Sequence, residues 1–139
     1  MLERQGERVY ALLRLITGSM FALHGVRKLF GFPTGHMPEV GSQLWIGGVI
    51  ELVSGACLFL GFLTPIAGLV ASGTMAVAYV QFHWMFQFGV ELIPLSNRGE
   101  LALLYCLVFL LIACRGPGSF SVDAWLQRPR RSSLQAALD

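Results

Sequence analysis

The sequence predicts an all-α integral membrane protein, a bundle of four spanning helices. Charged residues are 13% of its 139 residues, against about 25% in an ordinary soluble domain. Hydrophobic residues reach 55% and the mean hydropathy is +0.63. These polar residues are too few to cover a water-exposed surface, and the apolar residues fall in long blocks, so the chain is expected to face lipid.

Four apolar blocks cover residues 9–30, 44–63, 66–84 and 101–114. The second and third each reach about the 20 residues that a spanning helix needs. The fourth is shorter, but Glu100 and Arg115 at its ends can reach toward water, so this block is also expected to cross. The first block begins with basic residues, as a signal peptide does. Because it contains Arg14 and no small-x-small cleavage site follows, we interpret it as a retained helix.

Turn residues separate the blocks. Thr64-Pro65 leaves only a short turn, so the second and third blocks are expected to pack as antiparallel neighbours. Gly116-Pro117-Gly118 ends the fourth block, and residues 121–126 predict a short amphipathic surface helix. We therefore predict one transmembrane domain over residues 1–127 and a flexible cytoplasmic tail over 128–139.

The distribution of basic residues predicts the orientation. With an even number of spans, both termini lie on one side. Six basic residues lie on that side, and three lie on the other: Arg27, Lys28 and Arg98. The excess predicts cytoplasmic termini in a multi-pass protein of the inner (cytoplasmic) membrane. No solvated basic face is left for nucleic acid, so the expected partner is the lipid bilayer.

This topology gathers the ionisable residues of the spans in the outer half of the membrane, except Arg14, which lies nearer the inner surface. The residues are His24, Arg27, Lys28, Glu51, His83 and Glu100. Glu51 shares its helix face with small residues, as in a helix-packing surface. A charge at the centre of a span costs about 2.5–3.5 kcal/mol, so Glu51 must be protonated or paired. By depth, the candidate partners are Lys28, Arg27 and His24.

Two interpretations of Glu51 follow. It is either a proton-relaying or substrate-binding carboxylate, or half of a buried ion pair that fixes helix packing. No metal is predicted, because no spacing such as His-x-x-x-His occurs, and the three cysteines form no Cys-x-x-Cys. The aromatic residues near the outer surface are typical of an interfacial belt, and some could line a site for a flat quinone ring.

Several short motifs resemble the DoxX family of small four-helix membrane proteins. They are Leu13-Arg14-Leu15, His24-Gly25, Lys28-Leu29-Phe30-Gly31, Leu60-Gly61-Phe62-Leu63-Thr64 and Gly116-Pro117-Gly118-Ser119-Phe120-Ser121-Val122-Asp123, with Gly18, Phe21, Gly47, Glu51, Gly55 and His83 between them. Family members often continue with glycines where this chain has Phe32-Pro33-Thr34. The resemblance implies a four-helix fold in the cytoplasmic membrane. It also implies a link to redox chemistry, because relatives include subunits of quinone-reducing thiosulfate oxidation.

Three functional hypotheses remain, and they differ on whether the chain is an enzyme. In the first, it is a quinone-interacting oxidoreductase subunit in which His24 and Glu51 are catalytic and exchange protons with the ring oxygens. Substrate would be bound by Arg27, Lys28, His83 and Glu100. Electrons would come from a redox partner protein or from the substrate itself. In the second, it is a non-catalytic anchor or scaffold for partner proteins. In the third, it transports a small solute or protons as a homo-oligomer.

Overall fold

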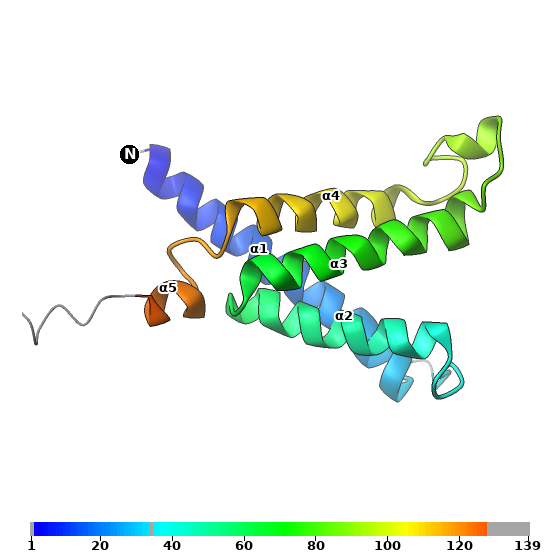
Figure 1. Cartoon of the computed structure of the whole chain (residues 1–139), viewed down its shortest axis with the longest axis horizontal. Coiled ribbons are helices and arrows are strands. Elements are labelled where there is room, and N and C mark those ends of the chain that lie inside the picture. The colour runs from blue at the N-terminus through cyan, green and yellow to red at the C-terminus, as the bar shows by residue number, and fades with distance from the viewer. Residues whose placement is uncertain (1, 34, 128–139) are drawn as a thin grey trace, which may run out of the picture.

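The computed structural model describes residues 2–33 and 35–127. Residues 1, 34 and 128–139, with the predicted tail among them, lie outside the described residues. All regular structure in the described part is helical (Figure 1). The elements are α1 (Leu2–Phe30), α2 (Gln43–Leu60), α3 (Thr64–Ala78), the π-helical segment η1 (Tyr79–Trp84), the 3-10 turn η2 (Val90–Leu92), α4 (Glu100–Arg115) and α5 (Val122–Leu126).

Three of these helices are long and apolar enough to cross a membrane. They are Arg4–Phe30, Gln43–Leu60 and Thr64–Trp84, the last comprising α3 and η1. Large apolar side chains such as Leu23, Leu69 and Leu104 lie exposed on the outside of the bundle. A protein with this surface needs lipid around it. The fourth helix, α4, has 16 residues, and its crossing stays a prediction.

The helix limits differ from the apolar blocks at two places. The first helix begins at Leu2, well before residue 9, because the Glu, Arg and Gln of its first turns favour helix even though they are polar. The third block ends as η1, in which the backbone widens into a π-helix. Apolar blocks mark where lipid begins, and they do not mark where a helix begins or changes its winding.

Side chains and glycines define the ends of α2. The Ser42 side chain accepts a hydrogen bond from the Trp45 N–H at 3.3 Å and caps the start of the helix. Gly61 ends the helix in the left-handed region, with φ 69°. The Phe62 N–H then donates to the Cys57 carbonyl at 2.9 Å. A short turn between the second and third spans is confirmed, but it comprises residues 61–63. Thr64 and Pro65, where the turn was predicted, form the start of α3, because proline fits the first turn of a helix.

The helices pack as two close pairs. In the α1–α2 pair, a Cβ added at Gly25 would lie 2.4 Å from the Leu52 nitrogen, and one at Gly18 would lie 2.7 Å from the Phe59 nitrogen. Only glycine allows the two backbones to approach so closely. In the α3–α4 pair, the Ser72 hydroxyl donates to the Cys106 carbonyl at 2.8 Å.

Aromatic rings join the two pairs in the core. The rings of Phe21 on α1 and Phe109 on α4 lie 4.7 Å apart between centroids, and both side chains are fully buried. Toward one end, Tyr105 stacks on Phe109 at 5.3 Å. This aromatic cluster lies directly beneath the site described below.

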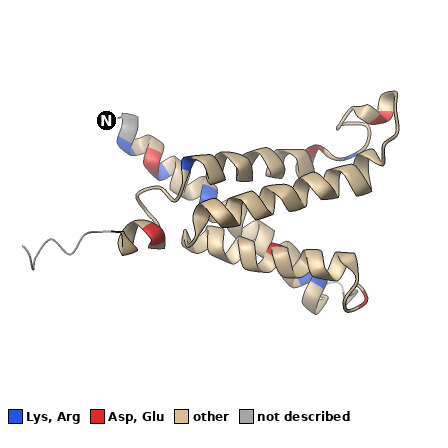
Figure 2. Ribbon diagram, viewed as in Figure 1, with Lys and Arg blue, Asp and Glu red and all other residues tan. Residues whose placement is uncertain are grey.

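The bundle has two unlike ends. One end, here called the terminal end, holds the start of α1, the turn between α2 and α3, and α5 (Figure 1). The other, here called the loop end, holds the connections 31–42 and 85–99, and there the two helix pairs diverge. Charged residues gather toward these ends and leave most of the ribbon between them uncharged (Figure 2).

Candidate functional site

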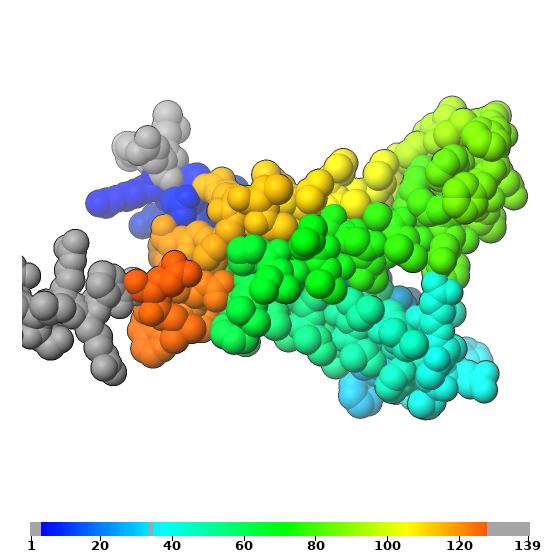
Figure 3. Space-filling model, in the orientation of Figure 1, coloured from blue at the N-terminus to red at the C-terminus, as the bar shows by residue number. Residues whose placement is uncertain are grey.

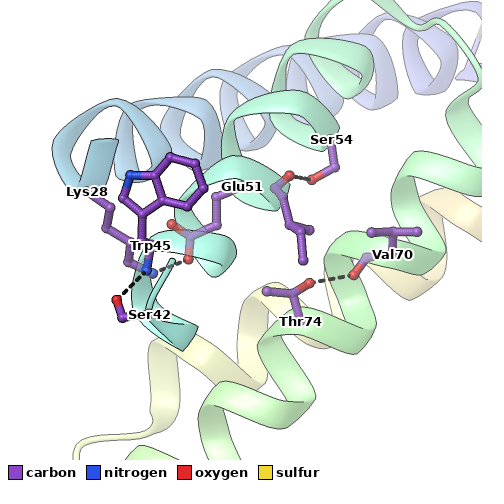
Figure 4. A network of polar contacts seen from close by, with 8 residues as sticks. Lys28, Ser42, Trp45, Glu51, Ser54, Val70 and Thr74 are labelled. Carbon is purple, nitrogen blue, oxygen red and sulfur yellow. Dashed lines mark hydrogen bonds and ion pairs between the residues drawn. The ribbon is translucent and has the colours of Figure 1, made fainter. Parts of the chain in front are cut away.

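An ion pair between α1 and α2 lies toward the loop end. The Lys28 ammonium is 2.6 Å from Glu51 Oε1 (Figure 4). The Glu51 side chain is 3% exposed and that of Lys28 is 30% exposed. Gly48 allows this contact, because a Cβ there would lie 2.8 Å from the Lys28 Cβ. Of the three partners that depth allowed, the structure pairs Glu51 with Lys28.

The second carboxylate oxygen of Glu51 is the unusual feature of this pair. Glu51 Oε2 is buried, and among the described residues it has no hydrogen-bond partner. A buried polar atom without a partner is energetically unfavourable, commonly by about 1–3 kcal/mol. The pair with Lys28 therefore neutralises the carboxylate and leaves one acceptor atom available to a ligand or a proton.

A cavity of ≈ 290 Å³, here called the central cavity, adjoins Glu51. All four long helices and the connection before α4 contribute to its walls. Its lining comprises Phe21, His24, Lys28, Leu44, Glu51, Met75, Ala78, Phe82, His83, Arg98, Leu101, Ala102 and Tyr105. A mostly apolar recess with a few convergent polar groups is the usual form of a small-molecule site.

Four of the six predicted site residues line the central cavity: His24, Lys28, Glu51 and His83. Arg27 is exposed and instead lines a neighbouring recess of ≈ 360 Å³, with His24, Lys28 and His36. Glu100 is exposed at the first residue of α4 and is not part of the cavity lining. The helix contacts therefore bring four of the predicted residues together and leave Arg27 and Glu100 outside.

The π-helical segment positions His83. Its Nδ1 lies 3.2 Å from the Asn97 carbonyl oxygen. Because a carbonyl oxygen only accepts, Nδ1 donates there, and Nε2 is the acceptor of the neutral ring. The ring also stacks on Tyr79 at 6.5 Å. Single π-helical turns are often found at functional sites, and this one carries two residues that line the cavity, Phe82 and His83.

The structure adds Tyr105 and Arg98 to the predicted residues. Tyr105 is buried and meets the His24 ring edge-on at 6.5 Å. A signal for it exists in the sequence, because Ala102, Tyr105, Phe109 and Ile112, the buried residues of α4, recur at spacings of three and four. Arg98 has a left-handed φ of 58°, which is uncommon for a side chain of this kind and which no pattern in the sequence indicates.

The cavity offers proton-exchanging groups on an apolar wall. An imidazole (His24), a carboxylate (Glu51) and a phenol (Tyr105) border it, beside the Lys28 ammonium. No group of three or more His, Cys, Asp or Glu within residues 2–33 and 35–127 is arranged to hold a metal ion. These groups can hydrogen-bond the oxygens of an uncharged ligand and exchange protons with them.

Comparison with known proteins agrees with this architecture. The DoxX family profile matches residues 9–84. An "Uncharacterized protein" of Haemophilus influenzae is 40% identical over 126 residues, 88% of this chain and 93% of the relative. A Bacillus subtilis protein named "Putative oxidoreductase CatD" is 25% identical over 132 residues, 91% of this chain and 92% of the relative. No solved structure matches. Both the profile and the 40% relative span most of the helices described above, and the chain belongs to the DoxX family.

Proposed function

We propose that the chain is a multi-pass protein of the cytoplasmic membrane in which α1 to α4 all cross and the terminal end faces the cytoplasm. The arginines of the terminal end support this orientation, because basic residues accumulate on the cytoplasmic side. In this proposal residues 1–127 form one domain. The central cavity then lies in the outer half of the membrane, within reach of molecules dissolved in the lipid.

Within this membrane domain, the proposed activity is that of a quinone-interacting subunit of an oxidoreductase. The observation that carries the proposal is Glu51 Oε2, a buried acceptor without a partner in the described part of the chain, beside a cavity with apolar and aromatic walls. The name of the Bacillus relative, an oxidoreductase, points to the same chemistry. A quinone ring suits such a site because it is flat and uncharged, and each of its two carbonyl oxygens accepts a hydrogen bond from Glu51 once Oε2 has taken up a proton.

Different residues of the site have different roles in the reduction of the quinone. Reducing a quinone to a quinol adds two electrons and two protons. Glu51 first takes up a proton on Oε2, and Glu51 and His24 then deliver one proton each to the ring oxygens and are reprotonated from water, while Lys28 stabilises negative charge that develops on the ring. Tyr105 orients the imidazole of His24, which its ring meets edge-on. The electrons come from a redox partner protein or from a reduced substrate that the assembly oxidises.

The experiment is quinone binding by the purified full chain in lipid nanodiscs. We expect wild type to bind a ubiquinone analogue, and Glu51→Gln and His24→Ala to weaken binding by about tenfold, since the Gln amide donates a weaker hydrogen bond to the ring than a protonated carboxyl and Ala donates none. Glu39→Gln is the matched control, because this exposed carboxylate of the same end does not line the central cavity. Circular dichroism and gel filtration establish that each variant is folded.

Two results would contradict the proposal. One is a wild-type protein that binds no quinone. The other is binding that Glu51→Gln, His24→Ala and Glu39→Gln leave equally strong. In the first case the ion pair of Lys28 and Glu51 is a packing element, and the protein that copurifies with the chain becomes the object of study.

A further inference from the structure

The seam between α2 and α3 is the loosest contact between consecutive helices of the bundle. The two helices diverge from their short turn, and the space-filling surface is hollowed between them (Figure 3). Near the loop end this hollow is bridged by a hydrogen bond from the Gln43 amide to the Gln81 side-chain oxygen. Glycines keep this space open. Gly47 on α2 and Gly73 on α3 both line it, and a Cβ added at Gly73 would meet no atom within 4 Å.

Two compartments follow one another along this seam. The outer one has a volume of ≈ 330 Å³, and Lys28 and Glu51 form part of its wall. The inner one has a volume of ≈ 340 Å³ and is lined almost entirely by apolar side chains, including Val53, Cys57 and Val70. Ile50 borders both compartments. Together they form one track, here called the seam groove, which begins at Glu51 and runs toward the terminal end.

The outer compartment also adjoins the central cavity. Lys28, Leu44, Glu51, Ala78 and Phe82 border both spaces. The carboxylate of Glu51 therefore lies in the wall between the mostly apolar central cavity and a groove on the outside of the bundle. A ligand that moved between the central cavity and the lipid would pass these shared side chains and the gap between α2 and α3.

The hydroxyls in the seam groove are already satisfied. Ser54 Oγ donates to the Ile50 carbonyl, and Thr74 Oγ1 donates to the Val70 carbonyl at 2.9 Å, each within its own helix (Figure 4). Side chains bonded in this way offer little to a polar ligand. The groove suits a hydrocarbon chain, and the polar group of its occupant belongs at Glu51.

We propose that the seam groove binds the hydrocarbon tail of the quinone, which reaches the central cavity sideways from the lipid between α2 and α3. This inference rests on the function proposed above and adds the route and the tail site. The ring lies beside Glu51 and Lys28, and the tail passes Gly73 and continues along Ile50 and Val70. The occupant is thus an amphiphile with one small uncharged head and a long apolar chain.

The first test maps the tail. Full-length protein in nanodiscs is irradiated with a ubiquinone analogue that carries a diazirine in its tail, and the labelled residues are identified by mass spectrometry. We expect labels within residues 49–57 and 63–70, suppressed by excess unlabelled quinone. Labels spread over α1 and α4, or labels that excess quinone leaves unchanged, would overturn the tail site.

The second test fills the groove. Gly73→Phe places a ring in the open space of the outer compartment, and we expect tailed quinone to bind about tenfold more weakly, as the loss of buried methylene contacts implies. Ala76→Phe is the matched control, because this exposed residue of the same helix lies outside the groove lining. Equal affinities for the two variants would overturn the lateral route.

The outcomes separate the two proposals. If wild type binds quinone while Gly73→Phe behaves as Ala76→Phe does, the route fails and the quinone function stands. If wild type binds no quinone, the function fails and the tail site fails with it. A phospholipid carrying the diazirine in an acyl chain completes the design. If it labels the groove as strongly as the quinone probe and unlabelled quinone does not displace it, the groove holds bulk lipid and the proposal is wrong.

Discussion

The two ends of the bundle contain buried charges of the same kinds but use them differently. At the terminal end, the guanidinium of Arg14 is 1% exposed and donates to the carbonyls of Leu58, Phe59 and Phe120. At the loop end, Lys28 and Glu51 neutralise each other and leave Glu51 Oε2 without a partner in the described chain. The comparison indicates that a charged side chain that hydrogen-bonds to helix ends holds those ends together. A charged pair between two helices leaves space for a cavity beside it.

The segment after α4 adds further hydrogen bonds at the terminal end. Asp123 accepts hydrogen bonds from the Leu63 and Thr64 N–H groups, both at 2.9 Å. Arg14 thus lies at the C-terminus of α2, where the helix dipole is negative, and Asp123 at the N-terminus of α3, where it is positive. Arg115 pairs with Glu7 at 2.7 Å and holds the last turn of α4 to α1. At the loop end, by contrast, a single hydrogen bond between side chains, from Gln43 to Gln81, joins α2 to η1 in the described part of the chain.

We expect the replacement of Arg14 to give the largest loss of stability, because Arg14 helps to hold the terminal end together. Arg14→Met removes three hydrogen bonds to carbonyls, one of them buried and two partly buried, and we expect the free energy of unfolding to fall by about 3 kcal/mol. Denaturant titration in mixed micelles measures it. Arg8→Met, an exposed arginine of the same helix, is the control. A loss of less than about 1 kcal/mol would mean that Arg14 does not stabilise this end.

Adding methyl groups tests the difference in packing directly. Gly25→Ala forces the α1 and α2 backbones apart, because the new Cβ would lie 2.4 Å from the Leu52 nitrogen. We expect a loss of about 2 kcal/mol. Gly73→Ala meets open space and removes a helix glycine, so a gain of up to about 1 kcal/mol is expected. Thermal unfolding of both variants should give shifts of opposite sign, and a comparable loss in both would remove the contrast between the two helix contacts.

We expect Lys28 and Glu51, the ion pair at the loop end, to be coupled in their contributions to the free energy of unfolding. Lys28→Met leaves the Glu51 carboxylate without its partner and should cost about 1.5 kcal/mol, reduced from a fully buried pair because Lys28 is partly exposed. The double variant with Glu51→Leu replaces the pair by apolar groups and should recover most of that loss. A double-mutant cycle of unfolding free energies measures the coupling. Strict additivity would show that the two charges do not stabilise each other.

We expect the replacement of Asp123 to give the smallest loss of stability, and we expect that loss to depend on pH. Burial raises the pKa of Asp123, but the hydrogen bonds from Thr64 and Leu63 outweigh it and hold the pKa below its ordinary value of 3.8. The folded state therefore binds fewer protons than the unfolded state, so the contribution is complete above about pH 4 and is lost as the pH falls through the lowered pKa.

Asp123→Asn tests this pH dependence. We expect a loss of about 1 kcal/mol at neutral pH, and a melting temperature that approaches that of wild type as the pH is lowered below about 4. Melting curves of both proteins across this range supply the measurement. A difference that stays constant down to low pH would mean that the charge of Asp123 contributes nothing.

The helix-packing faces and the candidate partners of Glu51 could be predicted from the sequence. The small-residue face that carries Glu51 on the second helix is confirmed as a packing face, because a Cβ added at Gly48 or Gly55 would lie 2.8 Å from the Lys28 Cβ or 2.4 Å from the Ala22 nitrogen of α1. Depth also gave Lys28 as one of three candidate partners of Glu51, and the structure pairs the two. Tyr105 was missed because residues 101–114 are all apolar, so the three- and four-residue spacing of Tyr105, Phe109 and Ile112 stands out only once these side chains are known to be buried.

Tertiary contacts decided the rest of the site. Arg14 read as an isolated polar residue near the inner surface, and only the return of the chain after α4 brings the Phe120 carbonyl to it at 2.6 Å. Glu100 shares the depth of the cluster but begins α4 on an exposed face, so depth did not predict its position. Depth in the membrane gives only one coordinate of a residue. Whether the side chain reaches the site also depends on how its helix is rotated about its axis.

By itself, the sequence determined that this chain belongs in a membrane, where its helices run and which faces carry small residues. These properties are sums or periods along the chain, so they are present before any helix meets another. Only the tertiary structure decided that one end closes around Arg14 and Asp123 and the other opens beside Glu51. That difference depends on the register and crossing of helices distant in sequence, because hydrogen bonds act over a few ångströms and a helix rotation of one residue moves a side chain by about 100°.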